Sequence, residues 1–508
     1  MFDKKTYRID SNIGFHNLFL IIIAAVVPLL MLWPVDARAQ LIKLKTAPVA
    51  TGDQFLVQPS VNVGMGGLSI ALDDTLADSF VNPAKAGRLG GTRVYMNPAF
   101  YKVTDGNGAV KTLSVGGLTS GNHWFGGVGI AIQEMSRPHT SSNRLRDQST
   151  NNNYFWMQAG RALNKSQTLG ARLHWAGLGA MSGVDMLYPR SRRIDQDGYM
   201  MDLRLGLDGE TGTGARYEAL ALFTRTDMTH EVIYSYSRNN GCMIEPWMCN
   251  SIMIPELQPS NVEENMDKTN TWGLHFGYDQ PVQESNWNWG SILTLNYKTH
   301  PKIPNYELMN IPRDPGNTWS FNAGLGASNT SDDNVTFGID FIIEPIWSNT
   351  WVEAQNDIWN QEETEVLVRK GEKTIENDFE FINSVIKTGV GWQGTHALLE
   401  AGILAKTYRY DLKQKDYVED TYREQEESWT EWTFSLAAGA IFRDITIQYT
   451  TLITTGTGQP GTASTGGWTM NAANAFSMGG EFIFAPDGEL ALESAKVFTH
   501  QLTVTLPL

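Results

Sequence analysis

From residue 92 onward, apolar and polar residues alternate with a period of two, and this alternation constrains the fold more than any other feature of the chain. It is clearest in five segments: 169–175, 201–208, 287–297, 335–341 and 399–406. Such alternation is typical of β-strands, in which successive side chains point to opposite faces. The chain is therefore predicted to be all-β. Its apolar faces form either the core of a soluble sandwich or the lipid-facing surface of a membrane barrel.

Three features favour the barrel. The predicted strands are roughly 9 to 13 residues long, as strands that cross a bilayer at a tilt must be. Short turns alternate with long polar connections near 136–152, 179–196, 228–268, 300–316, 346–378, 411–427 and 455–473. Tryptophans gather near strand ends, as in the aromatic girdles of membrane barrels: Trp124, Trp156, Trp175, Trp272, Trp287, Trp319, Trp392, Trp429 and Trp432. We predict a transmembrane antiparallel β-barrel over residues 92–508, with about 14 strands or alternatively about 16, because single-chain bacterial barrels have even numbers.

Residues 1–39 are predicted to be a cleaved secretory signal peptide. Lys4, Lys5 and Arg8 precede an apolar run over residues 18–33, and a small-residue cleavage site follows at 37–39. The alternative is a membrane anchor, but the run is shorter than the roughly 20 residues that a spanning helix needs. Export together with a barrel places the mature chain in the outer membrane.

The charge balance argues against nucleic acid as a partner. The formal net charge is −16, and removal of residues 1–39, which carry four basic and three acidic residues, changes it to −17. Nucleic-acid binding instead favours basic surfaces. The two cysteines, Cys242 and Cys249, are predicted to form a disulfide in the exported chain, with free thiols or a metal pair as alternatives.

The sequence carries no motif of catalysis or cofactor binding. Its nine histidines form no H-E-x-x-H pair, and it contains neither G-x-S-x-G nor a P-loop. We therefore expect no enzyme activity, no cofactor and no metal site. Two acidic segments, 353–380 and 411–431, are interpreted as solvated outer surface, or alternatively as sites where divalent cations bridge to lipopolysaccharide phosphates. Outer-membrane lipid and lipopolysaccharide are the expected partners.

The segment before the first strand, GMGGLSIALDDTLADSFVNPAKAG (64–87), follows no single period. Glycine permits close backbone approaches, a short helix over 69–80 would have acids near its start, and proline would end it. The residues concerned are Gly64, Gly66, Gly67, Asp73, Asp74, Asn82 and Pro83. Irregular backbone cannot face lipid but can occupy a lumen. We predict that residues 40–91 form a plug or hatch inside the barrel, or alternatively a tail on its rim.

This segment resembles the N-terminal signature of the FadL and PorV group of outer-membrane barrels. In that group a Gly-Met-Gly-Gly-like turn precedes an acidic step and an Asn-Pro-Ala stretch, which correspond here to residues 64–67, 71–74 and 82–84. The usual Gly-Leu that follows is replaced by residues 85–87. The resemblance is confined to this segment, and it implies a barrel with an N-terminal plug.

The resemblance also implies two functions. FadL-type members carry hydrophobic small molecules, such as long-chain fatty acids or aromatic hydrocarbons, through the outer membrane by diffusion. PorV-type members are accessories of type IX secretion that bind exported cargo proteins. A surface adhesin built of sandwiches is a third alternative, from outside this group.

Six charged side chains fall on the polar faces of predicted strands and are candidates for lining the lumen. They are Arg172, Asp202, Arg204, Asp340, Glu400 and Lys406. Polar side chains usually fill the interior of a membrane barrel. These six either form a salt-bridge network that fills the lumen or line a passage and bind a polar head group.

Overall fold

The computed structural model describes residues 42–508 with several gaps. The gaps are residues 43, 47, 49, 75, 105–107, 138–147, 182–190, 235–260, 301–315, 355, 361, 459–463, 466–489 and 492–493. The predicted signal peptide, residues 1–39, lies outside the described residues. So does the predicted disulfide between Cys242 and Cys249.

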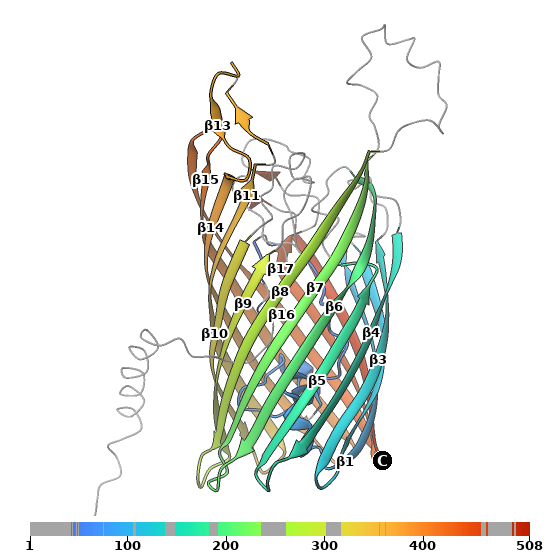
Figure 1. Ribbon diagram of the computed structural model, residues 1–508. Helices are drawn as coiled ribbons and strands as arrows, with labels where there is room; N and C mark the ends of the chain where they lie inside the picture. Colours follow the sequence, from blue (N-terminus) through green and yellow to red (C-terminus); the bar gives the residue numbers. More distant parts are fainter. Residues whose placement is uncertain are drawn as a thin grey trace, which may run out of the picture.

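Sixteen antiparallel strands close into one barrel (Figure 1). They are β1 (Gly91–Val103), β2 (Ala109–Ser120), β3 (Trp124–Arg137), β4 (Gln148–Ala162), β5 (Gln167–Leu178), β6 (Ser191–Glu210), β7 (Arg216–Tyr234), β8 (Asn261–Pro281), β9 (Trp287–His300), β10 (Gly316–Thr330), β11 (Val335–Glu353), β14 (Lys373–Gln393), β15 (Ala397–Asp416), β16 (Thr421–Phe442), β17 (Ile445–Gly458) and β20 (Ser494–Pro507). The last strand, β20, pairs with β1 and closes the sheet. The predicted barrel is confirmed with the larger strand number, and the sandwich is wrong, because these strands form one closed sheet.

The two ends of the barrel differ in their connections. At one end the strands are joined by short turns such as 121–123 and 443–444, and at the other by longer connections such as 235–260. Outer-membrane barrels have short periplasmic turns and longer outer loops. We therefore call the short-turn end periplasmic and the other end outer. Two short hairpins pair outside the barrel sheet, β12 (Ile358–Trp359) with β13 (Val366–Val368) and β18 (Ser464–Thr465) with β19 (Leu490–Ala491).

The outward face carries the apolar half of the alternation. Leu205 and Leu399 are 54% and 55% exposed, whereas Asp202 and Asp340 on the opposite face are 3% and 1% exposed. Exposed apolar side chains on a closed barrel are the surface that meets lipid, so the protein is an outer-membrane β-barrel.

The tryptophan prediction needs one correction. Seven of the nine predicted girdle tryptophans are exposed on the outer surface: Trp124, Trp175, Trp272, Trp287, Trp319, Trp392 and Trp432. Trp156 is instead buried in the lumen beside Phe80, and Trp429 packs inward against Tyr410. Both occupy inward positions of their strands, so the girdle prediction was wrong for these two.

Some strands match the predicted length, such as β2 with 12 residues, but others are longer, up to 22 residues in β16. Residues 411–427, predicted to be a loop, continue β15 and β16 as a hairpin at the outer end (Figure 1). Inward Leu412 is buried, and outward Lys413 lies opposite Glu424 on the neighbouring strand. The alternation with a period of two thus continues above the membrane, but there the outward residues are charged. Because such a polar composition resembles that of a loop, these strand residues were predicted to be a loop.

The segment before β1, residues 42–89, lies inside the periplasmic part of the barrel and along the inner wall above it (Figure 1). It contains three short elements, η1 (Val63–Met65), α2 (Ala77–Val81) and η2 (Pro83–Arg88). We call residues 42–89 the N-terminal segment. None of the described helices is long and apolar enough to cross a membrane.

Candidate functional site

The N-terminal segment makes one circuit of the inner wall between residues 61 and 89, in reverse strand order. Its polar contacts run from β17 to β6: Gln448 with Val61, Ser435 with Gly66, Lys387 with Gly67, Asp340 with Ser69, Asn288 with Ala71, Arg216 with Asp73, and Arg204 with Val81. From there η2 contacts β5, β4, β3 and β2 and leads into β1. The segment therefore touches most of the circumference of the barrel.

Asp74 joins the beginning and the middle of this circuit. Its carboxylate accepts hydrogen bonds from the Ser60 hydroxyl at 2.5 Å and from the backbone nitrogens of Val61 and Asn62. It also accepts from the nitrogens of Leu76 and Ala77 at the start of α2, at 3.2 and 2.9 Å. A carboxylate at 2% exposure is stabilised by such donors, so Asp74 holds two parts of the segment together.

The helix is shorter than predicted. Only Ala77–Val81 are helical, not 69–80. The backbone nitrogen of Ser69 donates to Asp340 at 2.9 Å, and the carbonyl of Ala71 accepts from Asn288 and Ser328. These backbone groups bond to the wall, so they are not available for an earlier helical turn.

Glycines on both sides allow the segment to lie directly on the wall. Gly66 and Gly67 have φ of 73° and 70°, a left-handed conformation that favours glycine. A Cβ on the wall would collide with the segment backbone at Gly170, Gly290, Gly389 and Gly402. At Gly290, for example, it would lie 2.5 Å from the Ile70 carbonyl oxygen. The contact is therefore as close as backbone geometry permits.

Three predicted lumen charges hold the end of α2. Arg204 donates to both carboxylate oxygens of Asp202, at 2.8 and 2.9 Å, and to the carbonyl of Val81 at 3.0 Å. Arg172 donates to the carbonyl of Phe80, and its guanidinium lies 5.4 Å from the ring centroid of Phe80. These contacts satisfy carbonyls that have no partner within the short helix.

The other three predicted lumen charges are spread along the wall. Asp340 accepts from Ser69, as above, and Glu400 accepts from Gln448 at 3.0 Å beside Gly64. Lys406 pairs with Glu344 at 2.9 Å. The six residues all face the lumen, but they do not converge on one site.

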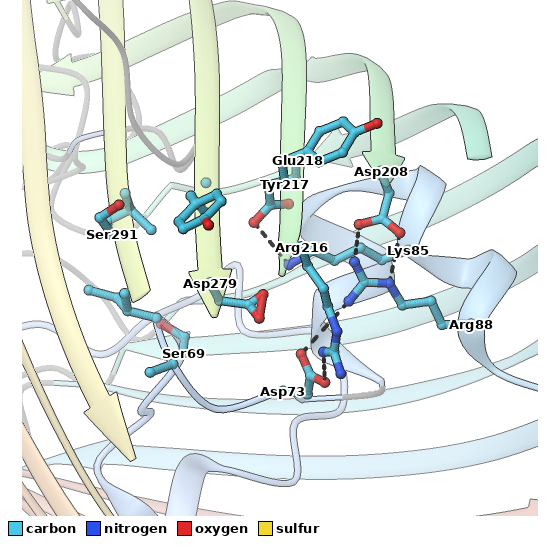
Figure 2. Close-up of a pocket in the computed structure, with 15 residues that line it drawn as sticks. Ser69, Asp73, Lys85, Arg88, Asp208, Arg216, Tyr217, Glu218, Asp279 and Ser291 are labelled. Carbon is cyan, nitrogen blue, oxygen red and sulfur yellow. Dashed lines mark hydrogen bonds and ion pairs between the residues drawn. The ribbon is translucent and has the colours of Figure 1, made fainter. Parts of the chain in front are cut away.

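A cluster of ion pairs joins the N-terminal segment to β6 and β7 at the periplasmic end (Figure 2). Three pairs cross the interface: Lys85 with Glu218 at 2.9 Å, Arg88 with Asp208, whose Nε bond is 2.7 Å, and Arg216 with Asp73. We call these six residues the ionic seam. Burial opposes ionisation of Asp73, yet Arg216, Lys85 and Arg88 together hold the pKa of its carboxyl below the usual range.

A small cavity lies within the ionic seam (Figure 2). Its volume is about 20 Å³, which is room for roughly one water molecule. Asp279 on β8 lines this cavity and makes no ion pair with any described residue. Across the described part of the chain, no group of three His, Cys, Asp or Glu side chains is placed to hold a metal ion. The cavity is thus too small and too charged for a hydrophobic ligand.

Apolar side chains line the inner wall towards the outer end. One cluster contains Ala131, Tyr154, Ala176, Leu178, Ile194, Met200, Met228 and Val232 on β3 to β7, together with Met181 after β5 and Val57 of the N-terminal segment. A second contains Ile346, Phe379, Phe381, Tyr410 and Leu412 on β11, β14 and β15, together with Ile42 and Leu44 of the N-terminal segment. Barrel interiors are usually polar. Apolar clusters on the inner face are therefore the feature of this lumen that most needs a functional explanation.

Two prolines interrupt the backbone pairing of the wall. The β1–β20 pairing omits Asn97 and Pro98, and the β10–β11 pairing is broken opposite Pro345. Proline has no N–H to donate to a neighbouring strand. Side chains bridge the first gap, because Gln501 Nε2 and the Thr503 hydroxyl donate to the side-chain oxygen Oδ1 of Asn97 at 2.7 and 2.8 Å. The sheet therefore remains closed between β1 and β20.

Comparison with solved structures finds distant matches. The toluene transporter TodX of Pseudomonas putida is 11% identical, with 91% of this chain and 100% of that chain covered and a TM-score of 0.37. A FadL homologue of Pseudomonas aeruginosa is 10% identical, with 88% and 98% covered and a TM-score of 0.41. A bacterial polysaccharide outer-membrane secretin is 6% identical, with 82% and 99% covered and a TM-score of 0.38.

No family model matches the chain, and no curated protein matches it significantly. At these identities and TM-scores, no ligand or partner can be transferred to this chain, and the fold is established by its own strand pairing.

The sequence interpretation missed most of the ionic seam. Asp208, Arg216 and Glu218 lie at the ends of two neighbouring strands, and Lys85 and Arg88 follow the Asn-Pro-Ala stretch. In each pair, one partner is basic and the other acidic. The sequence does show charged residues close to the turn at 211–215. Matching them to residues 73–88, however, requires knowing how the segment lies in the folded barrel.

Proposed function

We propose that this barrel lets hydrophobic small molecules diffuse passively across the outer membrane, with the N-terminal segment acting as its plug. The observation that carries the proposal is the apolar inner wall towards the outer end. Met228 and Val232 are fully buried on the inner face of β7, where a water-filled channel would place polar side chains. These side chains pack against one another and against Val57 of the N-terminal segment, so they offer a hydrophobic solute a favourable environment in place of water once that packing opens.

The plug role is supported by the contacts of the segment. Its circuit contacts strands from β17 round to β2, and the ionic seam contains a cavity of only about 20 Å³. We infer that the segment obstructs the periplasmic half of the lumen for a hydrophilic solute. Passage of any solute then requires movement of the segment or a route through the wall.

The test is uptake of the neutral dye Nile red by cells that carry the protein in an outer membrane with intact lipopolysaccharide. The variant Leu178→Glu/Met228→Glu places two charges on the apolar inner wall and should slow uptake. The matched control is Leu178→Met/Met228→Leu, which conserves apolar character and volume and should leave uptake unchanged. Equal uptake by cells with and without the protein would refute the proposal.

One observation favours a second candidate, a secretion accessory that binds exported protein. The hairpin of β12 and β13 extends beyond the outer end of the barrel (Figure 1), and its Trp359 and Leu367 are 50% and 44% exposed. Exposed apolar residues outside the lipid-facing belt are typical of interaction surfaces. Mild detergent extraction followed by mass spectrometry tests it. Secretion subunits or cargo that disappear when residues 354–372 are replaced by a short Gly-Ser turn would support this role.

A further inference from the structure

The first described residues of the chain occupy an apolar site on the inner wall. Ile42 and Leu44 are 5% and 4% exposed and belong to one cluster with side chains of β11, β14 and β15. On the wall side the cluster consists of Ile346, Phe379, Phe381, Tyr410 and Leu412, with Trp429 packed against it. Without residues 42–44, these wall side chains would lose apolar neighbours on the lumen side.

The wall of this site is an arranged set of aromatic rings. The centroid of Phe381 lies 5.6 Å from that of Phe379 and 5.3 Å from that of Tyr410. Tyr408 stacks on Trp429 with centroids 5.0 Å apart and an interplanar angle of 16°. Aromatic rings provide a large apolar contact area and attract cations to their faces.

The occupant is attached by side-chain contacts and not by the sheet. The described residues 42 and 44–46 belong to no strand. The Tyr410 hydroxyl donates to the carbonyl of Thr46 at 2.9 Å. The Lys45 ammonium pairs with Glu431 and lies 5.6 Å from the ring centroid of Tyr408. The chain therefore places two apolar side chains and one ammonium in the site.

The charges of the site determine what could replace this occupant. Lys406 lies opposite Glu431 in the pairing of β15 with β16, but its ammonium pairs with Glu344 at 2.9 Å. If Lys45 withdraws, Glu431 keeps the Tyr408 hydroxyl at 3.4 Å and loses its own ion-pair partner, and Lys406 would have to serve two carboxylates. A partly buried carboxylate without a counter-charge is costly. An anionic ligand would add to this cost, whereas an ammonium would replace Lys45.

We propose that this site binds hydrophobic amines, and that residues 42–45 of the chain occupy it as a tethered competitor. The apolar part of the ligand replaces Ile42 and Leu44 on the aromatic wall. Its ammonium pairs with Glu431 and faces Tyr408. This inference rests on the proposed uptake function and adds to it a preference for a cationic head group.

The test compares three probes that share the same alkyl chain length and differ in the charge of the head group: dodecylammonium, dodecanol and dodecanoate. The full-length mature protein is held in dodecyl maltoside at pH 7, and hydrogen–deuterium exchange is followed in the peptide that covers residues 42–50. Dodecylammonium should displace the segment and accelerate its exchange at a concentration about tenfold lower than dodecanoate requires, equivalent to about 1.4 kcal/mol. Dodecanol should be intermediate.

Two variants examine the charge directly. Glu431→Gln removes the carboxylate, so the three probes should act at similar concentrations. Glu380→Gln is the matched control, because Glu380 lies on the outward face of β14 and should leave the preference intact. Lys45→Met should raise the exchange rate of residues 42–50 even without a probe, because Glu431 then favours release of the segment.

The outcomes separate this inference from the proposed function. If all probes act equally on the native protein, or dodecanoate acts at the lowest concentration, the amine preference is wrong while Nile red uptake remains open to test. If no probe accelerates exchange, the site is not exchangeable and the inference fails whatever the uptake assay shows. Loss of Nile red uptake with a retained amine preference would instead refute uptake and leave a binding site.

Discussion

Arg216 on β7 lies directly opposite Asp279 on β8, yet its guanidinium bonds to Asp73 of the N-terminal segment. Cross-strand neighbours of opposite charge usually pair with each other. Here the wall cation pairs with the segment, and Asp279 remains at the edge of the small cavity. Arg216 therefore has a second carboxylate beside it, Asp279, with which it could form an ion pair if Asp73 moved away.

The first prediction concerns the choice of Arg216 between Asp73 and Asp279 as its ion-pair partner. Asp73→Asn removes the charge that holds Arg216 to the segment, and Arg216 should turn to Asp279. The side chain of Asp73 is 47% exposed, so the expected loss is about 1 kcal/mol or less. Hydrogen exchange of residues 73–88 should accelerate by up to about fivefold. Asp279→Asn is the control and should leave exchange unchanged, and an equal acceleration there would contradict this account.

The same pair predicts a pH dependence. Partial loss of water would raise the pKa of Asp73, but Arg216, Lys85 and Arg88 surround its half-exposed carboxylate and lower that pKa in the folded protein. A lowered pKa contributes stability above the unfolded value, about 3.9 for aspartate, and this is lost as the pH falls through the folded value. The contact between Arg216 and Asp73 should therefore weaken below about pH 4. Asp73→Asn should show a flatter exchange profile between about pH 5 and pH 2 than the native protein.

Substitution of Asp74 should destabilise the N-terminal segment more than substitution of Asp73. It accepts five hydrogen bonds while buried, and Asp74→Asn replaces one of its two acceptor oxygens by a donor group. Because hydrogen bonds to charged groups contribute about 1.5 to 3 kcal/mol each, local stability of residues 60–81 should fall by about 3 kcal/mol or more. Limited proteolysis should cut this region, whereas the barrel keeps its heat-dependent migration on gels. Asp333→Asn, in an exposed turn, should resist cleavage like the native protein.

Gly402 provides a test of the close contact between wall and segment. Gly402→Ala places a methyl group against the backbone of Met65 and Gly66. Overpacking of this kind costs about 1 to 3 kcal/mol. The segment around residue 65 should become accessible to protease. Gly117→Ala is the matched control, since the nearest atom to its new Cβ would be 3.6 Å away, and similar cleavage in both variants would show that the contact is not tight.

The Asp202–Arg204 pair predicts non-additive effects. Arg204→Gln leaves Asp202, at 3% exposure, without its bidentate partner and should destabilise the barrel by about 3 to 5 kcal/mol. The double variant Asp202→Asn/Arg204→Gln removes both charges and should be more stable than the single variant. Urea unfolding in lipid vesicles measures both. Additive losses would mean that the two residues act independently.

The sequence predicted the barrel and the facing of its side chains because both follow from a local period of two. The alternation along their strands correctly predicted that Arg172 and Asp340 face the lumen. The same alternation, applied to β4, would have predicted that Trp156 faces inward. The segment contacts could not be predicted in this way. Whether Arg216 meets Asp73 or Asp279 depends on where residues 61–89 rest against the closed wall, and the extent of β15 and β16 was hidden by charged residues that resemble a loop.

The reverse-order circuit of residues 61–89 has a consequence for assembly. Because each short stretch of this segment is matched to one or two strands, its length measures the inner circumference of the cylinder. Adding or removing a strand would leave the segment too short or too long for its anchoring groups at Ser435, Asp340 and Arg204. The segment is therefore fitted to a cylinder of sixteen strands, and a sheet with another number of strands would leave some of these anchoring groups without their partners.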